Sequence, residues 1–370
     1  MFTEAQSLGW LNPASGSKSD REKFNDAHPI ASNDAPPIAS NDASNFSLTK
    51  FSLKGQAEKM KKDMLAEVHV MKNIALLGQI TAIYAPPNTG KTMLVIHLIK
   101  EAIKHGVIRG ENIFYINADD SYNGLIEKVI LAEKYGFHML APENNGFKTK
   151  ELTQHMKTMI EQDSAKEKVI ILDTLKKFTD LMDKKNCSDF MNTARAFSTK
   201  GGTLILLAHT NKNRNAEGKV VAGGTSDIGD DADCVFLLDE TSHNNDIKSV
   251  FFENTKARGN VGKEIGFTYS TSANHNYEQK LDSVTALDAA TVHTQKEALT
   301  IAVEQEQNQP IIDVITVELS KCDQLKTNLI DLIHKSGFSV RSIRAVLTKY
   351  EGEKWNVIPN GRNSKKYSIK

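Results

Sequence analysis

One loop of the sequence, residues 85–92, has the residue types and spacing of a loop that binds phosphate groups. It reads APPNTGKT, with an expected strand before it and an expected helix after it. In such a loop, backbone N–H groups and the start of the helix surround the phosphate oxygens. We expect Lys91 to reach the β- and γ-phosphates of a nucleotide and the hydroxyl of Thr92 to bind Mg²⁺. The other loop residues expected to contact the nucleotide are Pro87, Asn88, Thr89 and Gly90.

The loop departs from the usual pattern at one position, because Ala85 stands where the first glycine is usual. Alanine fits if that residue keeps a negative φ, so the departure is mild. The alternative interpretation is an ordinary turn between a strand and a helix.

A single acidic residue, Asp173, follows the apolar run at residues 169–172. An aspartate at the carboxyl end of a buried strand lies where ligands bind in parallel α/β sheets. There it would hold a water molecule on Mg²⁺. The alternative is that Asp173 only caps the next helix, because aspartate is a preferred residue at helix N-termini. Its presence beside the 85–92 loop favours the metal-binding interpretation.

Two further expected strands also end in polar groups. Asp119 and Asp120 close residues 113–118, and His209 follows residues 204–208. We expect Asp119 to polarise an attacking water molecule and His209 to sense the γ-phosphate through a hydrogen bond. The alternatives are a solvated turn that caps the helix from Ser121, and a histidine that only ends its strand. Four strand ends on one sheet edge each carry a group suited to the same chemistry.

These strand ends belong to an expected α/β sheet within residues 51–270. Apolar runs of strand length occur at residues 80–85, 113–118, 169–172, 204–208 and 235–238. Helical stretches separate the first four runs, for example residues 92–105 and 121–135, each closed by a glycine. This pattern predicts a mostly parallel sheet with helices on both faces. Residues 247–253 and 264–270 predict two more strands that extend the sheet antiparallel.

Composition fits a globular protein of two or three domains. The chain has 370 residues, 39% hydrophobic and 25% charged, with a formal net charge of +0. The neutral total excludes a uniformly basic nucleic-acid coat protein. The three cysteines lie far apart, which excludes a disulfide scaffold and a zinc finger as primary interpretations. No signal peptide or membrane-spanning run is visible, so we expect no membrane partner and a cytoplasmic location.

The composition also changes along the chain and predicts four segments. Residues 1–50 are rich in Ser, Asn, Asp and Pro, contain the unit PIASNDA twice, and are expected to be disordered. Residues 51–270 are expected to form the α/β core, and the polar, weakly helical residues 271–310 are expected to be a linker. Residues 311–370 form a C-terminal domain, and from Lys321 onward eleven Lys or Arg residues stand against four Asp or Glu. The neutral total therefore conceals a basic tail.

Two sets of cations in the core are candidates for function. Residues 211–227 form a long glycine-rich loop with Lys212, Arg214 and Lys219, which is either a mobile nucleic-acid-binding loop or a solvated connection. Lys256 and Arg258 lie in the late hairpin and would be ordinary surface cations in an isolated domain. In a ring of subunits, they would project into a neighbour's nucleotide and stabilise transition-state charge.

The C-terminal segment has the order of elements of a winged helix. Residues 325–335 and 340–350 predict two helices, and residues 355–358 and 365–369 predict a hairpin around a turn at 359–362. Such a unit places one helix in the major groove and the hairpin on the DNA backbone. The residues expected to contact DNA are Arg341, Arg344, Lys349, Arg362, Lys365 and Lys366. The alternative is a small dimerisation or protein-docking domain with a solvated basic face.

With these motifs in place, residues 51–270 resemble the RecA-like ATPases of hexameric replicative helicases. The resemblance is closest to RepA-type enzymes of plasmids and phages, and more distant to DnaB and KaiC. It rests on PPNTGKT, the Asp pair after the second strand, ILDTLKKF, LLAHTNK and TKARGN. The basic tail is similar to winged-helix modules of mobile-element replication proteins, a less specific match.

The resemblance implies a RecA-like P-loop core that uses ATP and Mg²⁺. It implies that Lys91 and Thr92 bind the nucleotide and Mg²⁺, that Asp173 is the Walker B acid, and that His209 is the sensor. Lys256 and Arg258 match cations that family members insert across the subunit interface. The family usually has a glutamate where Asp119 stands, and a carboxylate one methylene shorter predicts slow hydrolysis.

The sequence thus predicts an ATP-dependent, ring-forming DNA helicase or translocase that replicates a plasmid, phage or integrated element. It would be a homo-oligomer, expected to be a hexamer, with single-stranded DNA on the core and double-stranded DNA on the C-terminal domain. A replication initiator or a primase would be a further partner.

Two other interpretations stay open. An ATP-gated initiator, loader or regulator that does not unwind DNA is favoured by Asp119 and the winged helix, whereas Lys256 and Arg258 favour the motor. A recombination mediator that forms filaments needs an N-terminal polymerisation segment, for which residues 51–71 are the one candidate.

Overall fold

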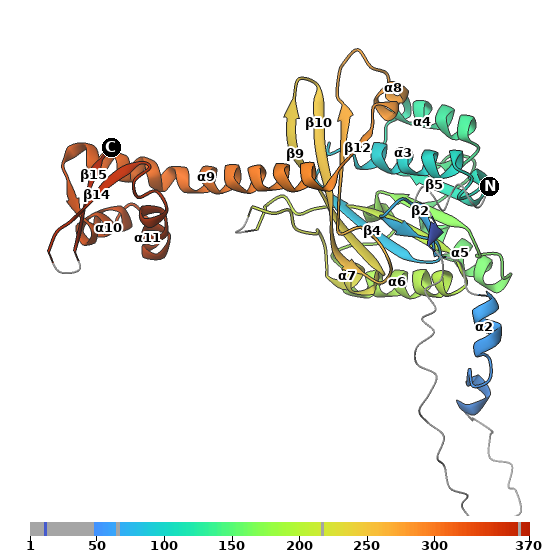
Figure 1. Cartoon of the computed structure of the whole chain (residues 1–370). Coiled ribbons are helices and arrows are strands. Elements are labelled where there is room, and N and C mark those ends of the chain that lie inside the picture. The colour runs from blue at the N-terminus through green and yellow to red at the C-terminus, as the bar shows by residue number, and fades with distance from the viewer. Residues whose placement is uncertain (1–10, 13–47, 64–66, 216–217, 362–363) are drawn as a thin grey trace, which may run out of the picture.

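A nine-stranded sheet forms the centre of the molecule in the computed structural model (Figure 1). The structure describes residues 11–12, 48–63, 67–215, 218–361 and 364–370. The sheet strands are β4 (Ile80–Ala85), β5 (Ile113–Asn117), β6 (His138–Leu140), β7 (Val169–Asp173), β8 (Thr203–His209), β9 (Cys234–Asn244), β10 (Ile247–Ala257), β11 (Glu264–Ser270) and β12 (Thr285–Leu287).

The strand order is β12-β11-β10-β9-β4-β8-β7-β5-β6. From β9 to β6 each pair of neighbours is parallel, and β10, β11 and β12 add to β9 in antiparallel fashion. The expected fold class, a mostly parallel sheet with an antiparallel extension, is confirmed. Because β8 lies between β4 and β7, the carboxyl ends of three neighbouring strands face the same edge of the sheet.

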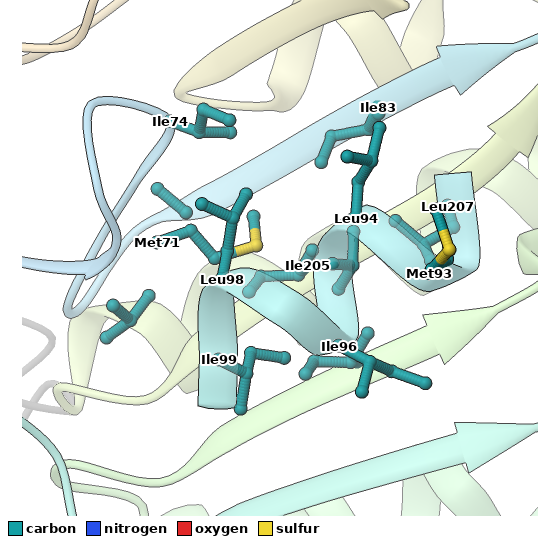
Figure 2. Close-up of a cluster of buried hydrophobic side chains, with 14 of the residues drawn as sticks. Met71, Ile74, Ile83, Met93, Leu94, Ile96, Leu98, Ile99, Ile205 and Leu207 are labelled. Carbon is teal, nitrogen blue, oxygen red and sulfur yellow. The ribbon is translucent and has the colours of Figure 1, made fainter. Parts of the chain in front are cut away.

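Helices cover both faces of this sheet, as the apolar strands require. On one face, α3 (Lys91–Lys104) and α4 (Tyr122–Tyr135) pack on the strands, and on the other face lie α5 (Leu152–Glu161), α6 (Lys184–Thr199) and α7 (Asp227–Asp231). Figure 2 shows side chains of α3, among them Leu94 and Leu98, buried with Ile83 and Ile205 of the sheet. Short 3-10 turns are η2 (Gly110–Asn112), η3 (Thr149–Glu151) and η4 (Leu175–Lys177). This packing fixes the start of α3 against the end of β4.

The N-terminal region contributes a small sheet of β1 (Leu11–Asn12), β2 (Glu67–Met71) and β3 (Ala75–Leu76). Before β2 come η1 (Leu48–Phe51) and α2 (Ala57–Asp63). Most of the segment expected to be disordered, residues 1–50, lies outside the described residues. Its two described parts do have regular structure, because Leu11 and Asn12 pair with β2 and residues 48–51 form η1.

The segment expected to be a weakly helical linker, residues 271–310, has more regular structure than its polar sequence indicates. These residues form α8 (Tyr277–Asp282), β12 and most of α9 (Ala289–Lys321). Caps at Asn276 and Asp288 start the two helices, and Lys296 of α9 pairs with Glu253 and Glu264 of the sheet. The segment is polar because α9 lies at the surface, and a polar surface helix has no broad apolar face.

The C-terminal unit lies at the far end of α9, away from the large sheet (Figure 1). It contains β13 (Gln324–Leu325), α10 (Lys326–His334), α11 (Val340–Lys349), β14 (Trp355–Pro359) and β15 (Lys365–Ile369), with sheet order β13-β15-β14. The last turns of α9 supply Ile311, Ile312, Ile315 and Leu319 to its core. The two helices and the hairpin therefore form where they were expected, while the domain boundaries and the winged-helix assignment stay predictions. Among the described helices, none is long and apolar enough to cross a membrane.

Candidate nucleotide site

A cleft of about 310 Å³ opens at the carboxyl ends of β4, β5, β7 and β8. Residues 86–93 line one side of it, together with Asp119, Asp120, Asp173 and His209. The structure therefore brings together all four strand ends that the sequence singled out. Two residues that the sequence did not single out, Lys128 and Tyr277, also line the cleft.

The phosphate-binding loop has a backbone that depends on Gly90. This residue has φ +80°, and a Cβ atom there would lie 2.5 Å from the hydroxyl oxygen of Tyr269 on β11. The left-handed backbone disfavours any side chain at this position, and a Cβ atom would also displace the ring of Tyr269. The hydroxyl of Thr89 donates to the carbonyl of Pro86 at 2.8 Å, and the ammonium of Lys248 on β10 donates to the carbonyl of Asn88 at 3.1 Å. The loop is thus held by its own residues and by the antiparallel extension.

Asp173 is the centre of a buried polar network at the floor of the cleft. Its Oδ1 lies 3.3 Å from Nζ of Lys91, and its Oδ2 accepts hydrogen bonds from Thr92 Oγ1 at 2.6 Å and from Tyr115 at 2.8 Å. Lys91, Asp173 and Tyr115 are buried. Burial, with the charge of Asp173 added, raises the pKa of Tyr115 well above its usual value, so Tyr115 stays a donor.

Residues of this network suit a magnesium–nucleotide complex. Mg²⁺ prefers oxygen ligands and is commonly held by one or two side-chain oxygens together with substrate phosphates. The Thr92 hydroxyl and the Asp173 carboxylate provide such oxygens beside the loop. Across the described residues, no cluster of three or more His, Cys, Asp or Glu side chains forms a metal site.

Asp119 and His209 face each other across the mouth of the cleft. His209 Nε2 lies 3.7 Å from Asp119 Oδ2, and Lys176 Nζ lies 3.9 Å from Asp119 Oδ1. Burial, followed by the charges of Lys91 and Lys176, lowers the pKa of His209 below 6.5. At neutral pH the imidazole is therefore uncharged, and the Asp119 carboxylate keeps an exposed face, 43% of its side chain, for a water molecule.

Asp120 is held away from this pair by a different set of contacts. Its carboxylate accepts from the ammonium of Lys128 and from the amide of Asn117. The side chain of Lys128 is only 7% exposed, and its Nζ lies 5.0 Å from the ring centre of Tyr277 on α8. Asp120 is thus held by a buried lysine, whereas Asp119 has longer contacts, of 3.7 and 3.9 Å, and a more exposed side chain.

Lys256 and Arg258 do not reach the cleft of their own chain. Lys256 donates to the carbonyls of Gly229 and Asp230, and Arg258 lies 3.5 Å from Asp233. The backbone N–H of Asp233 in turn donates to the carbonyl of Ile80, which begins β4. The 85–92 loop lies at the other end of the same strand. The two cations therefore lie at the opposite edge of the sheet, and a role at a nucleotide needs a second subunit.

The glycine-rich loop at 211–227 is attached to the core rather than extended. Arg214 forms a bidentate ion pair with the buried Asp239 on β9, with hydrogen bonds of 2.6 and 2.9 Å. The ammonium of Lys219 lies 3.4 Å from the carboxylate of Glu253 on β10. Of the three cations expected to bind DNA here, Lys212 alone is exposed without a carboxylate partner in the described part of the loop.

A second, open cavity of about 580 Å³ adjoins the nucleotide cleft, and His209 lines both. Three lysines, Lys150, Lys176 and Lys177, line this second cavity together with the backbone around Gly223 and Gly224. The sequence reasoning missed it, because the three lysines come from two separate segments with no shared motif.

In the C-terminal unit, the expected DNA-binding cations fall into two groups. Arg341 and Arg344 are exposed on α11, and neither forms an ion pair with a described residue. Lys349, Lys365 and Lys366 each pair with a carboxylate, those of Glu304, Glu351 and Asp323. Arg362 lies outside the described residues.

Comparison with known proteins finds only distant structural similarity. No sequence family and no curated protein matches the chain. Solved structures similar to it include a KaiC-like protein from the hyperthermophilic archaeon Pyrococcus horikoshii, with 12% identity and a TM-score of 0.41. Another is the flagellar accessory protein FlaH from Methanocaldococcus jannaschii, with 14% identity and a TM-score of 0.40. Each comparison covers 58% of this chain and 91% of the other. The case for function rests on the cleft itself.

Proposed function

We propose that this chain binds and hydrolyses ATP with Mg²⁺ and uses the energy as a ring-forming DNA helicase or translocase of a plasmid, phage or integrated element. One observation carries the ATPase part. Lys91, Thr92, Asp173, Asp119 and His209 come from four strand ends and meet in one cleft.

The residues divide the chemistry between them. When bound, Mg²⁺ neutralises charge that develops on the phosphates. The loop N–H groups and Lys91 hold the phosphates, and Thr92 and Asp173 supply oxygens to the cation. Asp119 orients a water molecule for attack, and the uncharged His209 donates a hydrogen bond from its ring N–H to a γ-phosphate oxygen.

DNA binding by the core is supported by the second cavity. Its three lysines suit a phosphate backbone, and it shares His209 with the nucleotide cleft, so a bound strand would lie beside the reacting phosphate. On the C-terminal unit, Arg341 and Arg344 are the cations available for double-stranded DNA. The ring, and a role for Lys256 and Arg258 in it, remain parts of the proposal.

A second candidate is an ATP-gated DNA-binding initiator, loader or regulator without unwinding activity. The contacts of Asp119 favour it. This carboxylate is already shared between Lys176 and His209, and it is one methylene shorter than a glutamate. Both features slow the activation of water.

Steady-state ATP hydrolysis with and without single-stranded DNA separates the two functions, with Lys91→Ala as the blank. Strong stimulation by single strands supports the motor. Tight ATP binding with slow hydrolysis that ignores DNA supports the switch. A stable monomer in the presence of ATP and DNA, measured by light scattering, would count against the ring.

A further inference from the structure

Among the described residues that line the nucleotide cleft, Tyr277 lies farthest along the chain, well after the four strand ends. It begins α8, which lies between β11 and β12, the last two strands of the large sheet in chain order. Its hydroxyl oxygen has no accessible surface and no hydrogen-bond partner among the described residues. A buried hydroxyl of this kind is costly and rare in folded proteins, so it calls for a physical reason.

The position of this hydroxyl is fixed from several sides. The ring lies under the ammonium of Lys128 at 5.0 Å. The helix that carries it is tied to α3, because Asp282 accepts from Lys100 at 2.8 Å and the carbonyl of Leu281 lies 3.0 Å from His97 Nδ1. The helix contacts fix the backbone at Tyr277, and rotation of the ring would break its contact with Lys128.

The surroundings of the hydroxyl indicate what its partner is. Tyr277 lines the same cleft as the carboxylates of Asp120 and Asp173. Burial and then the negative charges of these two residues raise the pKa of Tyr277, so the phenol remains a donor. Asp120 already accepts from Lys128 and Asn117, and Asp173 from Thr92 and Tyr115. A donor beside two occupied acceptors at the floor of a phosphate cleft suits an oxygen brought by the ligand.

We propose that Tyr277 is a nucleotide-site residue whose hydroxyl donates to an oxygen of the magnesium–nucleotide complex, either a phosphate oxygen or a metal-bound water. The inference rests on the proposed binding of a nucleotide. It adds a contact from α8, so that the segment leading into α9 takes part in the site directly.

Tyr277→Phe removes the hydroxyl and keeps the ring on Lys128. The matched control is Tyr350→Phe, because Tyr350 has an equally buried hydroxyl without a partner, in the C-terminal unit. Binding of a non-hydrolysable ATP analogue is measured by calorimetry on the full chain, with Mg²⁺ and with a chelator. Melting temperatures are measured with and without the analogue.

We expect Tyr277→Phe to bind the magnesium–analogue complex about tenfold more weakly, the loss of one hydrogen bond to a charged oxygen. If the affinity for the analogue falls only when Mg²⁺ is present, the contact is to a metal-bound water. If it falls equally in the chelator, the contact is to a phosphate oxygen. Without ligand, both variants should melt at the same temperature as the wild type or about 2–4 °C higher, because each loses an unpaired buried hydroxyl. Tyr350→Phe should bind like the wild type.

Two results would overturn the inference without touching the proposed function. One is equal binding by Tyr277→Phe and the wild type. The other is a lower melting temperature of ligand-free Tyr277→Phe with an unchanged ligand-induced shift, which would make the hydroxyl purely structural. A wild type that binds no nucleotide would overturn the proposed function, and this inference with it.

Discussion

The hydroxyl of Tyr115 donates to the same carboxylate oxygen of Asp173 that accepts from Thr92, at 2.8 and 2.6 Å respectively. Tyr115 is fully buried and comes from β5, while Asp173 ends β7. The two strands pair in parallel. A buried phenol therefore sets the orientation of the carboxylate that is expected to face Mg²⁺.

Tyr115→Phe should weaken the response to Mg²⁺. Partners of a metal-facing carboxylate typically contribute about 10- to 100-fold to metal affinity, so we expect the Mg²⁺ concentration for half-maximal hydrolysis to rise by about tenfold or more. Nucleotide binding in a chelator should not change. Tyr84→Phe, a buried tyrosine on the other face of the sheet, is the control. A Tyr115 variant with wild-type Mg²⁺ dependence would remove this residue from the site.

Asp119 should control the rate of hydrolysis and not the affinity for ATP. Replacing a group that activates water costs about 10²- to 10⁴-fold in kcat, so Asp119→Asn should fall in that range while nucleotide binding persists. Asp119→Glu should hydrolyse faster than the wild type, because the longer side chain reaches past His209 and Lys176. Single-turnover hydrolysis measures both. A glutamate variant slower than the wild type would argue that the aspartate is already well placed.

His209 should make stability depend on pH below neutrality. Because burial and the charges of Lys91 and Lys176 lower its pKa from 6.5, the unfolded chain takes up a proton at a higher pH than the folded chain does. The folded state therefore loses stability as the pH falls below 6.5 and through the lowered folded-state pKa, and keeps it above 6.5. The wild type should lose more melting temperature between pH 7.5 and pH 5.5 than His209→Gln does. Parallel pH profiles of the two proteins would contradict this.

Arg214 should contribute mainly to the stability of the fold and not to DNA binding. Arg214→Ala leaves the buried Asp239 without its partner, and we expect a loss of about 2 kcal/mol in the free energy of unfolding, reduced from the value for a fully buried pair because Arg214 is 41% exposed. Lys212→Ala, in the same loop, should leave stability unchanged. Urea unfolding of the two variants tests the difference. If Arg214→Ala is as stable as the wild type but loses DNA binding, the original assignment to DNA is restored.

Arg341 and Arg344 should carry double-stranded DNA binding. Each exposed cation that contacts a phosphate contributes roughly one unit to the slope of log affinity against log salt, so the double alanine variant should bind more weakly and with a slope smaller by about two. Lys365→Ala should have a smaller effect, because Lys365 is paired with Glu351 at 2.8 Å. Fluorescence anisotropy over a salt series gives both quantities. An unchanged slope would favour a protein-docking role for this unit.

Much of the core followed from local pattern. The strands β4 and β11 begin and end at the expected residues, since their apolar runs are sharply bounded. The loop at residues 85–92 and the acids at strand ends were readable because parallel strands place their carboxyl ends at one edge. In segment 271–310 the extent of helix was underestimated, because a polar surface helix has no broad apolar face and because α9 continues through Pro310.

The partners of the site residues were not readable from sequence. Tyr115 is one of several apolar and aromatic residues in its strand, and nothing local says that its hydroxyl meets Asp173, 58 positions away. Lys128 lies eight positions after Asp120, a helical spacing that could have been noticed. Tyr277 had no signal at all, because its place in the cleft depends on how α8 packs on α3 and α4. Likewise, only the fold shows that Arg214 and Lys365 have carboxylate partners.

The single helix α9 also has a mechanical consequence. Its 33 residues rise about 1.5 Å each, so it measures about 50 Å from end to end, and its last turns enter the C-terminal core. It is an arm with one end fixed beside β9 and β11 and the other carrying a whole unit. On an arm of that length, a tilt of about 5° at the base moves the tip by about 4 Å, more than the spacing between successive base pairs of DNA.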